Sequence, residues 1–129
     1  MLETIVTALL GGAAAMGGKV ASEAAKDGYT ALKNLIVQKL GLNSDAAKAI
    51  ATLEAKPDSE GRQKTVTEEL ADAKVGDDPA LVEAARRLQA ALEQLPPEGR
   101  AHVQHAVGNY IAQASGGSTA KVIINGNPS

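Results

Sequence analysis

The sequence predicts a mainly α-helical protein: a small four-helix bundle with a long N-terminal helix, followed by a short β strand-turn-strand tail. Two observations support this fold class. Apolar residues recur at helical spacing between turn signals over the first 97 residues, and β-prone residues alternate on both sides of a Ser-Gly-Gly-Ser turn near the end. The 129 residues suffice for one domain, so we predict a bundle at 1–97 and a linker with an assembly motif at 98–129.

The first predicted helix covers residues 2–40 and ends at Gly41, a typical C-terminal helix cap. Its second half carries a regular apolar stripe. Its first half has no charge from Thr4 to Gly18 and contains four glycines, each of which costs about 1 kcal/mol in a helix interior. This half therefore needs close packing or a membrane to form a stable helix.

Three shorter helices complete the predicted bundle and end near residues 55, 73 and 95. The last of them has leucines at heptad spacing, which is typical of a seam that faces a bundle. The sequence also permits a short helix over 98–107. The three helices begin at capping residues, namely Asn43 or Ser44, Asp58 or Ser59, and Asp78 followed by Pro79.

Small residues recur every four positions in the first helix, as at Ala13, Gly17 and Ala21, so that a neighbouring backbone can approach closely. Two interpretations remain open: this is the central helix of a tight soluble bundle, or it contacts a membrane. The uncharged stretch is about 22 Å long as a helix, short of the roughly 30 Å hydrocarbon layer. The residues assigned to membrane contact or close helix packing are Leu2, Ile5, Val6, Leu9, Leu10, Gly11, Gly12, Gly17 and Gly18.

The tail, residues 101–129, holds one formal charge, Lys121, and no carboxylate. Its β-prone runs at 109–114 and 119–125 contain Asn, Gln and β-branched residues, as do segments that stack with copies of themselves. An isolated two-stranded hairpin is marginal in water, so we expect self-assembly, docking on the bundle, or disorder. The candidate assembly residues are Asn109, Tyr110, Ile111, Gln113, Gly116, Gly117, Val122, Ile123, Ile124 and Asn125.

Several function classes find no support in the composition. Without cysteine there is no disulfide scaffold or thiolate metal site, and without a basic stripe or stacking aromatics we expect no nucleic-acid partner. No phosphate-binding, dinucleotide-binding or nucleophile motif occurs, so we predict a non-enzyme without catalytic residues, cofactor or metal. His102 and His105 share a helical spacing, and we interpret them as exposed linker histidines.

Three segments together resemble a known architecture: the start MLETIVTALLGGAAAMGG, the bundle to about Pro97, and the tail VGNYIAQASGGSTAKVIINGNP. The arrangement is similar to that of bacterial cell-death effectors with a HeLo-like (Bell) domain and a C-terminal amyloid signalling motif. The resemblance implies that a NACHT or NB-ARC-type sensor with a matching motif templates the tail into a β-stack. The crowded bundles would then free the first helix to permeabilise a membrane.

The resemblance thus implies a cytoplasmic cell-death or immune-conflict effector that joins membrane lipid when assembled, with further copies of itself and the sensor as partners. The alternative is a scaffolding, adaptor or filament-forming module that oligomerises through its C-terminal strands without membrane activity. A catalytic or ligand-binding domain has the least support, because no set of polar residues converges in the sequence.

Overall fold

The computed structural model of the protein describes residues 2–123, with side chains up to Ile111 other than that of Asn109. Over these residues the chain forms six α-helices and one 3-10 turn, and no strand. The elements are α1 (Leu2–Gly17), α2 (Glu23–Leu40), α3 (Asp45–Ala55), α4 (Glu60–Asp72), η1 (Val75–Asp77), α5 (Pro79–Glu93) and α6 (Pro97–Ile123). The predicted mainly helical class is confirmed, whereas the predicted number of four helices is wrong.

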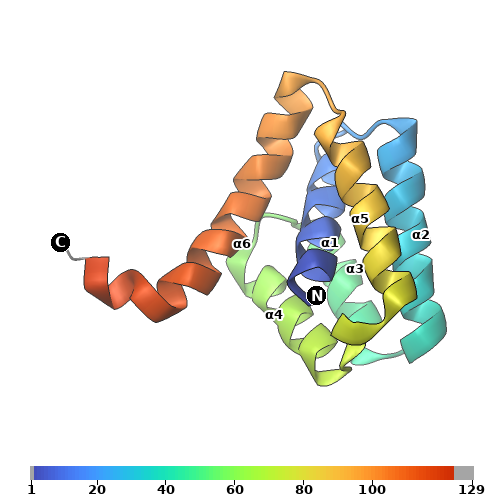
Figure 1. The fold of residues 1–129 in the computed structure, drawn as a ribbon, viewed down its shortest axis with the longest axis horizontal. Helices are drawn as coiled ribbons and strands as arrows, with labels where there is room; N and C mark the ends of the chain where they lie inside the picture. Colours follow the sequence, from blue (N-terminus) through green and yellow to red (C-terminus); the bar gives the residue numbers. More distant parts are fainter. Residues whose placement is uncertain (1, 124–129) are drawn as a thin grey trace.

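Helix α1 is the centre of the bundle, with the other helices arranged around it (Figure 1). Its buried residues run without interruption from Ala8 to Ala15 and include Ile5 and Val6. A helix that is apolar on all sides must be buried on all sides, which explains why α1 contacts every other helix of the described chain. The core therefore forms around a single helix and not along one seam.

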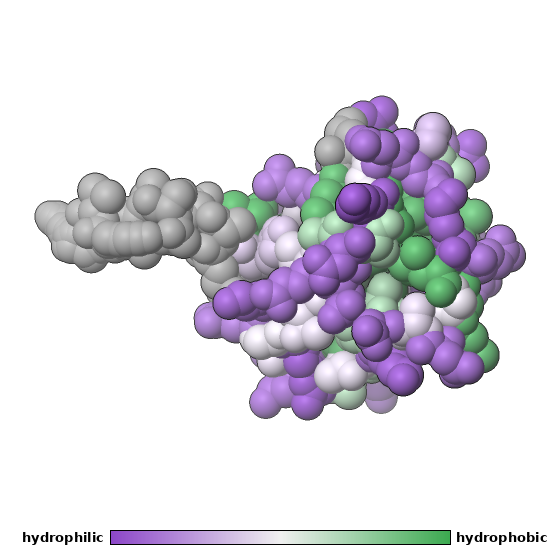
Figure 2. Space-filling model, turned by 90° about the horizontal axis from the view of Figure 1, so that it is seen from below, coloured by the Kyte–Doolittle hydropathy of each residue, from purple (hydrophilic) through white to green (hydrophobic). Residues whose placement is uncertain are grey.

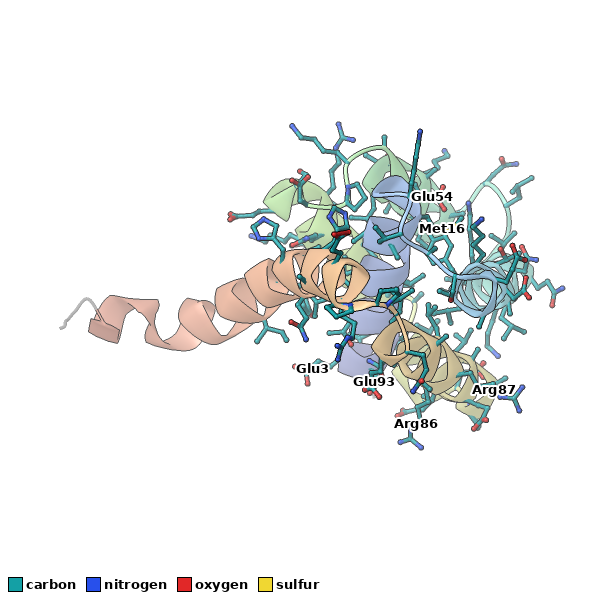
Figure 3. All side chains as sticks on the ribbon, turned by 90° about the horizontal axis from the view of Figure 1, so that it is seen from above. Glu3, Met16, Glu54, Arg86, Arg87 and Glu93 are labelled. Atoms are coloured by element: carbon teal, nitrogen blue, oxygen red, sulfur yellow. The ribbon has the colours of Figure 1, made fainter. Side chains whose placement is uncertain are left out.

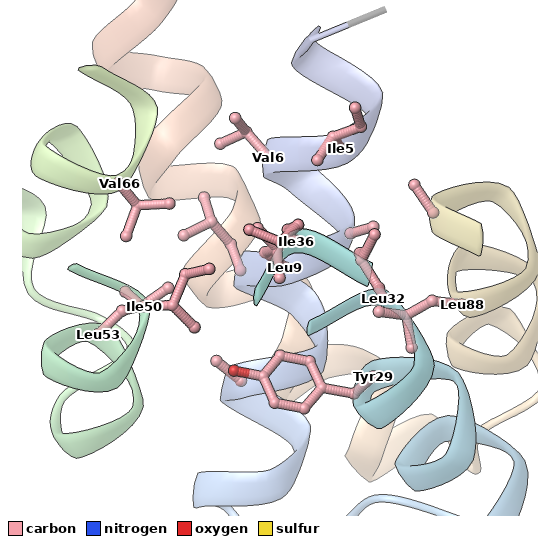
Figure 4. Packing of buried hydrophobic residues seen from close by; sticks show 14 of the residues in the cluster. Ile5, Val6, Leu9, Tyr29, Leu32, Ile36, Ile50, Leu53, Val66 and Leu88 are labelled. Carbon is pink, nitrogen blue, oxygen red and sulfur yellow. The ribbon is translucent and has the colours of Figure 1, made fainter. Parts of the chain in front are cut away.

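Four of the outer helices contribute large apolar side chains to this core (Figure 4). Leu32 and Ile36 of α2, Ile50 of α3, Val66 of α4 and Leu88 of α5 are all fully buried. The predicted heptad positions of α5 face inward, while its charged residues Arg86, Arg87 and Glu93 point outward (Figure 3). The amphipathic pattern of α5 thus confirms the predicted bundle-facing seam.

The predicted helix over 2–40 is wrong, because the chain turns after Gly17 and α2 begins at Glu23. Lys19 N donates to Met16 O at 3.2 Å and Val20 N donates to Ala15 O at 2.9 Å, which is a Schellman motif. Lys19 has φ of 58°, the left-handed conformation that glycine usually supplies. Because lysine and not glycine occupies this position, the sequence gives no clear signal for the end of the helix.

The other helix boundaries follow the capping residues closely. The serine alternatives are used, since the hydroxyls of Ser44 and Ser59 accept from Ala47 N and Arg62 N. Asp78 caps α5 and Pro79 is its first residue, as predicted. Ser22 caps α2 in the same way, accepting from Ala25 N at 3.1 Å, and this cap marks the turn that the sequence analysis missed.

The predicted strand-turn-strand tail is not confirmed, because α6 extends through Ile123 and covers both predicted runs as far as that residue. Ile124 and Asn125 lie outside the described residues. A helix satisfies its backbone hydrogen bonds within one chain, whereas strands need a neighbouring strand and an isolated hairpin is only marginally stable. In a single chain the helix is therefore the favoured form of this segment.

Candidate functional site

The enclosed surface of α1 depends on two glycines. A Cβ atom at Gly12 would lie 2.5 Å from Tyr29 Cδ1, and one at Gly11 would lie 2.8 Å from Leu92 Cδ1. Side chains of α2 and α5 thus occupy the space that a larger residue would need. This geometry is that of close helix packing, and membrane contact by α1 stays a prediction.

A hydrogen bond between α1 and α5 adds a polar tie to this packing. Gln89 Nε2 donates to Thr7 Oγ1 at 2.9 Å, and the Thr7 hydroxyl donates to Glu3 O at 2.8 Å. Both side chains are only partly buried. Any movement of α1 out of the bundle must break this tie along with the apolar contacts.

Tyr29 joins three helices at the other end of α1. Its ring packs against Gly12, and its hydroxyl donates to Glu54 Oε2 at 2.6 Å. Lys33 Nζ donates to the same oxygen at 2.7 Å, so two side chains of α2 bond to one carboxylate of α3, while the Tyr29 ring contacts α1. Burial of the ring, and then the hydrogen bond and charge of Glu54, raise the pKa of Tyr29 far above its usual range.

Two shallow clefts flank the C-terminal end of α1, where Met16 and Glu54 lie close together (Figure 3). One has a volume of about 330 Å³ and is lined by His102, His105 and Asp58, the other of about 450 Å³ by Met16 and Lys33. Over the described chain, no group of three His, Cys, Asp or Glu side chains is placed to hold a metal ion.

The two histidines lie on helix α6 and not in a linker. His102 and His105 are exposed on α6 and line the smaller cleft. The His102 imidazole lies directly against Gly18, so a side chain at position 18 would require the imidazole to move. These histidines hence belong to the contact between α6 and the end of α1.

Asp78 and Lys39 form an ion pair between the start of α5 and the end of α2. The Lys39 ammonium is the main cause, and the two amide donors of the α5 cap a further one, of a lowered pKa for the Asp78 carboxyl. The two residues are distant in sequence, and their ion pair joins the end of α2 to the start of α5.

Helix α6 has two parts with different surroundings. Val103 and Ala106 are 8% and 3% exposed and belong to the core, and Tyr110 is partly buried against it. Ile111 is 50% exposed, and beyond it the helix runs away from the bundle (Figure 1). The first part of α6 therefore completes the bundle, and the second part leaves it.

Few large apolar side chains are exposed on the described surface. Among the described side chains, the large apolar ones most exposed are Leu42 at 75%, Ile111 at 50% and Met16 at 40%. The face seen from below carries hydrophilic residues with hydrophobic ones between them (Figure 2). Over residues 2–123, no helix combines the length and the apolar character needed to cross a membrane.

The structure separates the two predicted groups of site residues. In the group assigned to membrane contact or packing, Leu2 is partly exposed, Gly17 and Gly18 are exposed, and the rest are buried in α1. The assembly group lies on α6 up to Ile123. Of this group only the side chains of Tyr110 and Ile111 are described, and they mark the place where α6 leaves the core.

The polar contacts between helices have little signal in the sequence. Gln63 is 0% exposed and lies between α4 and α6. The only signal for it is position, because it stands three residues before Val66 and seven before Leu70 on the apolar stripe of α4. The bond between Gln89 and Thr7 has no comparable signal, since the two residues are far apart in sequence.

The fold and site define a helical module built around an apolar central helix, with a last helix that leaves the body. Residues 2–128 match the family model described as the Het-E N-terminal domain. The chain belongs to this family, a HeLo-like family of cell death and heterokaryon incompatibility. No curated protein matches the chain, and no solved structure matches it.

Proposed function

We propose that this protein is a non-enzymatic cell-death effector that assembles through residues 109–125 and acts on a membrane through α1. Membership of the Het-E N-terminal domain family supports the cell-death role. The observation that carries the assembly step is the course of α6, which leaves the bundle at the half-exposed Ile111 and has no carboxylate beyond it.

The composition of this second part of α6 supports conversion into paired strands. Each glycine disfavours a helix by about 1 kcal/mol relative to alanine, and β-branched residues prefer strands. Copies of the chain, or a NACHT or NB-ARC-type sensor with a matching motif, would supply the neighbouring strand. The helix-disfavouring residues beyond Ile111 are Gly116, Gly117, Thr119, Val122 and Ile123.

Membrane action would then fall to α1. Its 16 residues span about 24 Å at 1.5 Å per residue, less than the roughly 30 Å of a hydrocarbon core. We therefore favour insertion by several α1 helices of an assembled set, in contact with lipid, over a single span. The resting protein would be cytoplasmic and would join the membrane only on assembly.

A second candidate function follows from the enclosure of α1. Because α1 holds the core together, its release would dismantle the bundle. A scaffolding or adaptor module that assembles through the same tail would keep α1 in place. The two functions differ in whether α1 must move.

The assembly step is tested with Ile111→Lys and Val122→Lys. Ile111 is half exposed, so its substitution leaves the folded chain intact while placing an ammonium inside a β-stack. An unpaired charge in dry surroundings is strongly unfavourable, and we expect fibril formation to be lost in thioflavin and sedimentation assays. Leu42→Lys, at a 75% exposed site of the bundle, is the matched control and should assemble normally. Normal assembly of both tail variants would contradict the proposal.

The membrane step is tested by locking α1 in place. The protein has no cysteine, so Thr7→Cys with Gln89→Cys allows a short thiol crosslinker to join α1 to α5 where their side chains lie 2.9 Å apart. We expect the crosslinked protein to assemble without releasing liposome contents. Glu83→Cys with Arg87→Cys, crosslinked within α5, is the control and should keep leakage. Assembly without leakage by the unlocked protein would favour the scaffold instead.

A further inference from the structure

Gln63 lies in an unusual environment for a glutamine. Its side chain is completely buried between α4 and α6. The amide nitrogen donates to Pro57 O at 2.8 Å and to Ala106 O, on α6, at 3.3 Å. The hydrogen bond to Ala106 is the longer of the two, so the bond that holds α6 is weaker than the bond to Pro57.

The amide oxygen of Gln63 is buried too, and no donor of the described residues lies within hydrogen-bond reach of it. Reversing the amide would place this oxygen against two carbonyl oxygens, so the orientation is fixed by its acceptors. A buried acceptor without a donor carries its full desolvation penalty. This penalty is removed when α6 moves away and water reaches the oxygen.

Among the described side chains of α6, the apolar ones buried in the core are Val103 and Ala106. Val103 Cγ1 and Val107 Cγ2 lie 3.2 and 3.6 Å from the Cβ position of Gly11, and His102 rests on Gly18. At Gly108 nothing lies within 4 Å of the Cβ position, whereas Tyr110 still packs against the core. Two valines and an alanine, with the partly buried Tyr110, thus supply the apolar burial that opposes the penalty at Gln63.

We infer that the first part of α6, residues 98–110, opens from the bundle as a separate unit before the bundle unfolds, and that Gln63 sets how readily it opens. Opening hydrates the amide oxygen and uncovers the side of α1 that carries Gly11 and Gly18. Local opening of a weakly docked element, below the free energy of global unfolding, is a general property of proteins. The inference concerns the resting chain and does not depend on the proposed function.

Hydrogen exchange measured by mass spectrometry tests this in the full-length chain at constant pH. In the natural protein, amides at 103–110 should exchange faster than those of α1. Gln63→Met keeps the shape and removes the buried oxygen, so exchange in α6 should slow by roughly fivefold or more. Gln63→Glu places a carboxylate against two carbonyl oxygens, and exchange in α6 should rise by roughly tenfold or more.

Gln89→Ala is the matched control. Its bond joins α5 to α1 and persists when α6 opens, so exchange in α1 should rise while exchange in α6 stays within about twofold. The inference is overturned if the α6 amides follow those of α1 in the control, because α6 would then open only by global unfolding. It is also overturned if Gln63→Met leaves α6 exchange unchanged or faster. Gln63→Met alone decides the matter should Gln63→Glu fail to fold.

Discussion

Helices α1 and α6 share an unusual composition and have opposite surroundings. Both contain several glycines and have few charges. In α1 neighbouring side chains fill the space beside the glycines, since Tyr29 packs against the Cβ position of Gly12 and Leu92 against that of Gly11. At Gly108 of α6 nothing lies within 4 Å. Packing within the bundle therefore explains Gly11 and Gly12 of α1 and leaves Gly108 unexplained, which agrees with the proposal that α6 serves an assembled state.

Two of the three glycine pairs in the sequence, Gly17-Gly18 and Gly116-Gly117, also differ in their surroundings. Gly17-Gly18 ends α1, whereas the backbone of α6 stays helical through Gly116-Gly117. After the first pair, Lys19 takes a left-handed conformation, the partly buried Val20 packs against the core, and Ser22 caps the next helix. A glycine pair alone therefore does not end a helix, and the residues that follow it decide.

The largest effect is expected for Gly12→Val. The Cβ alone would lie 2.5 Å from Tyr29 Cδ1 and 3.1 Å from Leu88 Cδ2, so both side chains must move. Overpacking of this kind should lower the free energy of unfolding by about 3 kcal/mol. Thermal and urea denaturation measure it.

The same change at Gly108 is the control for this prediction. Because nothing lies within 4 Å of that position, Gly108→Val should change the free energy of unfolding of the bundle by less than about 0.5 kcal/mol. Equal effects at the two positions would contradict the difference in packing between Gly12 and Gly108.

Much of this architecture could be predicted from local signals. Caps at Ser44, Ser59 and Asp78 gave correct helix starts because a capping side chain acts on its own helix. The break at Lys19 was missed because a left-handed lysine depends on the tertiary contact of Val20, which the sequence does not display. The bond between Tyr29 and Glu54 and the burial of Gln63 depend in the same way on helices brought together by the fold.

The strands predicted for the tail show that a local pattern does not determine which structure a single chain forms. Alternating β-prone residues describe what a segment can form beside a partner, and a single chain forms the helix. The pattern at residues 109–123 therefore bears on an assembled state more than on the resting one.

Tyr29→Phe separates the apolar and polar contributions of Tyr29, because it keeps the ring against Gly12 and removes the hydroxyl that donates to Glu54. We expect a loss of about 1.5 kcal/mol in the free energy of unfolding near neutral pH. Chemical denaturation measures it. An unchanged stability would mean that the bond to Glu54 is matched by water in the unfolded chain.

The pH dependence of the same variant gives a second result. The pKa of Tyr29 is raised in the folded protein, so its contribution is complete below the unfolded value of about 10 and declines as the pH rises above it. The natural protein should therefore lose more stability than Tyr29→Phe between about pH 9 and 11. Parallel losses in the two proteins would contradict the raised pKa.

Gly108→Ala tests the α6 side of the comparison. Alanine favours the helix over glycine by about 1 kcal/mol, and the open space at this position accepts a methyl group. We expect higher helix content by circular dichroism and, under the proposed function, a longer lag before fibrils form. Faster assembly would mean that the helical form leads to the assembled state and does not compete with it.

The smallest effect is expected at the end of α1. Lys19 has φ of 58°, a conformation in which a side chain is unfavourable, so Lys19→Gly relieves this strain. Glycine also gains freedom in the unfolded chain, which offsets part of the benefit, and we expect a net stabilisation of about 0.5 kcal/mol. Lys64→Gly, at an exposed position inside α4, is the matched control and should destabilise by about 1 kcal/mol. If both substitutions destabilise equally, the turn after α1 does not use the left-handed conformation, and the contrast between the two glycine pairs loses its basis.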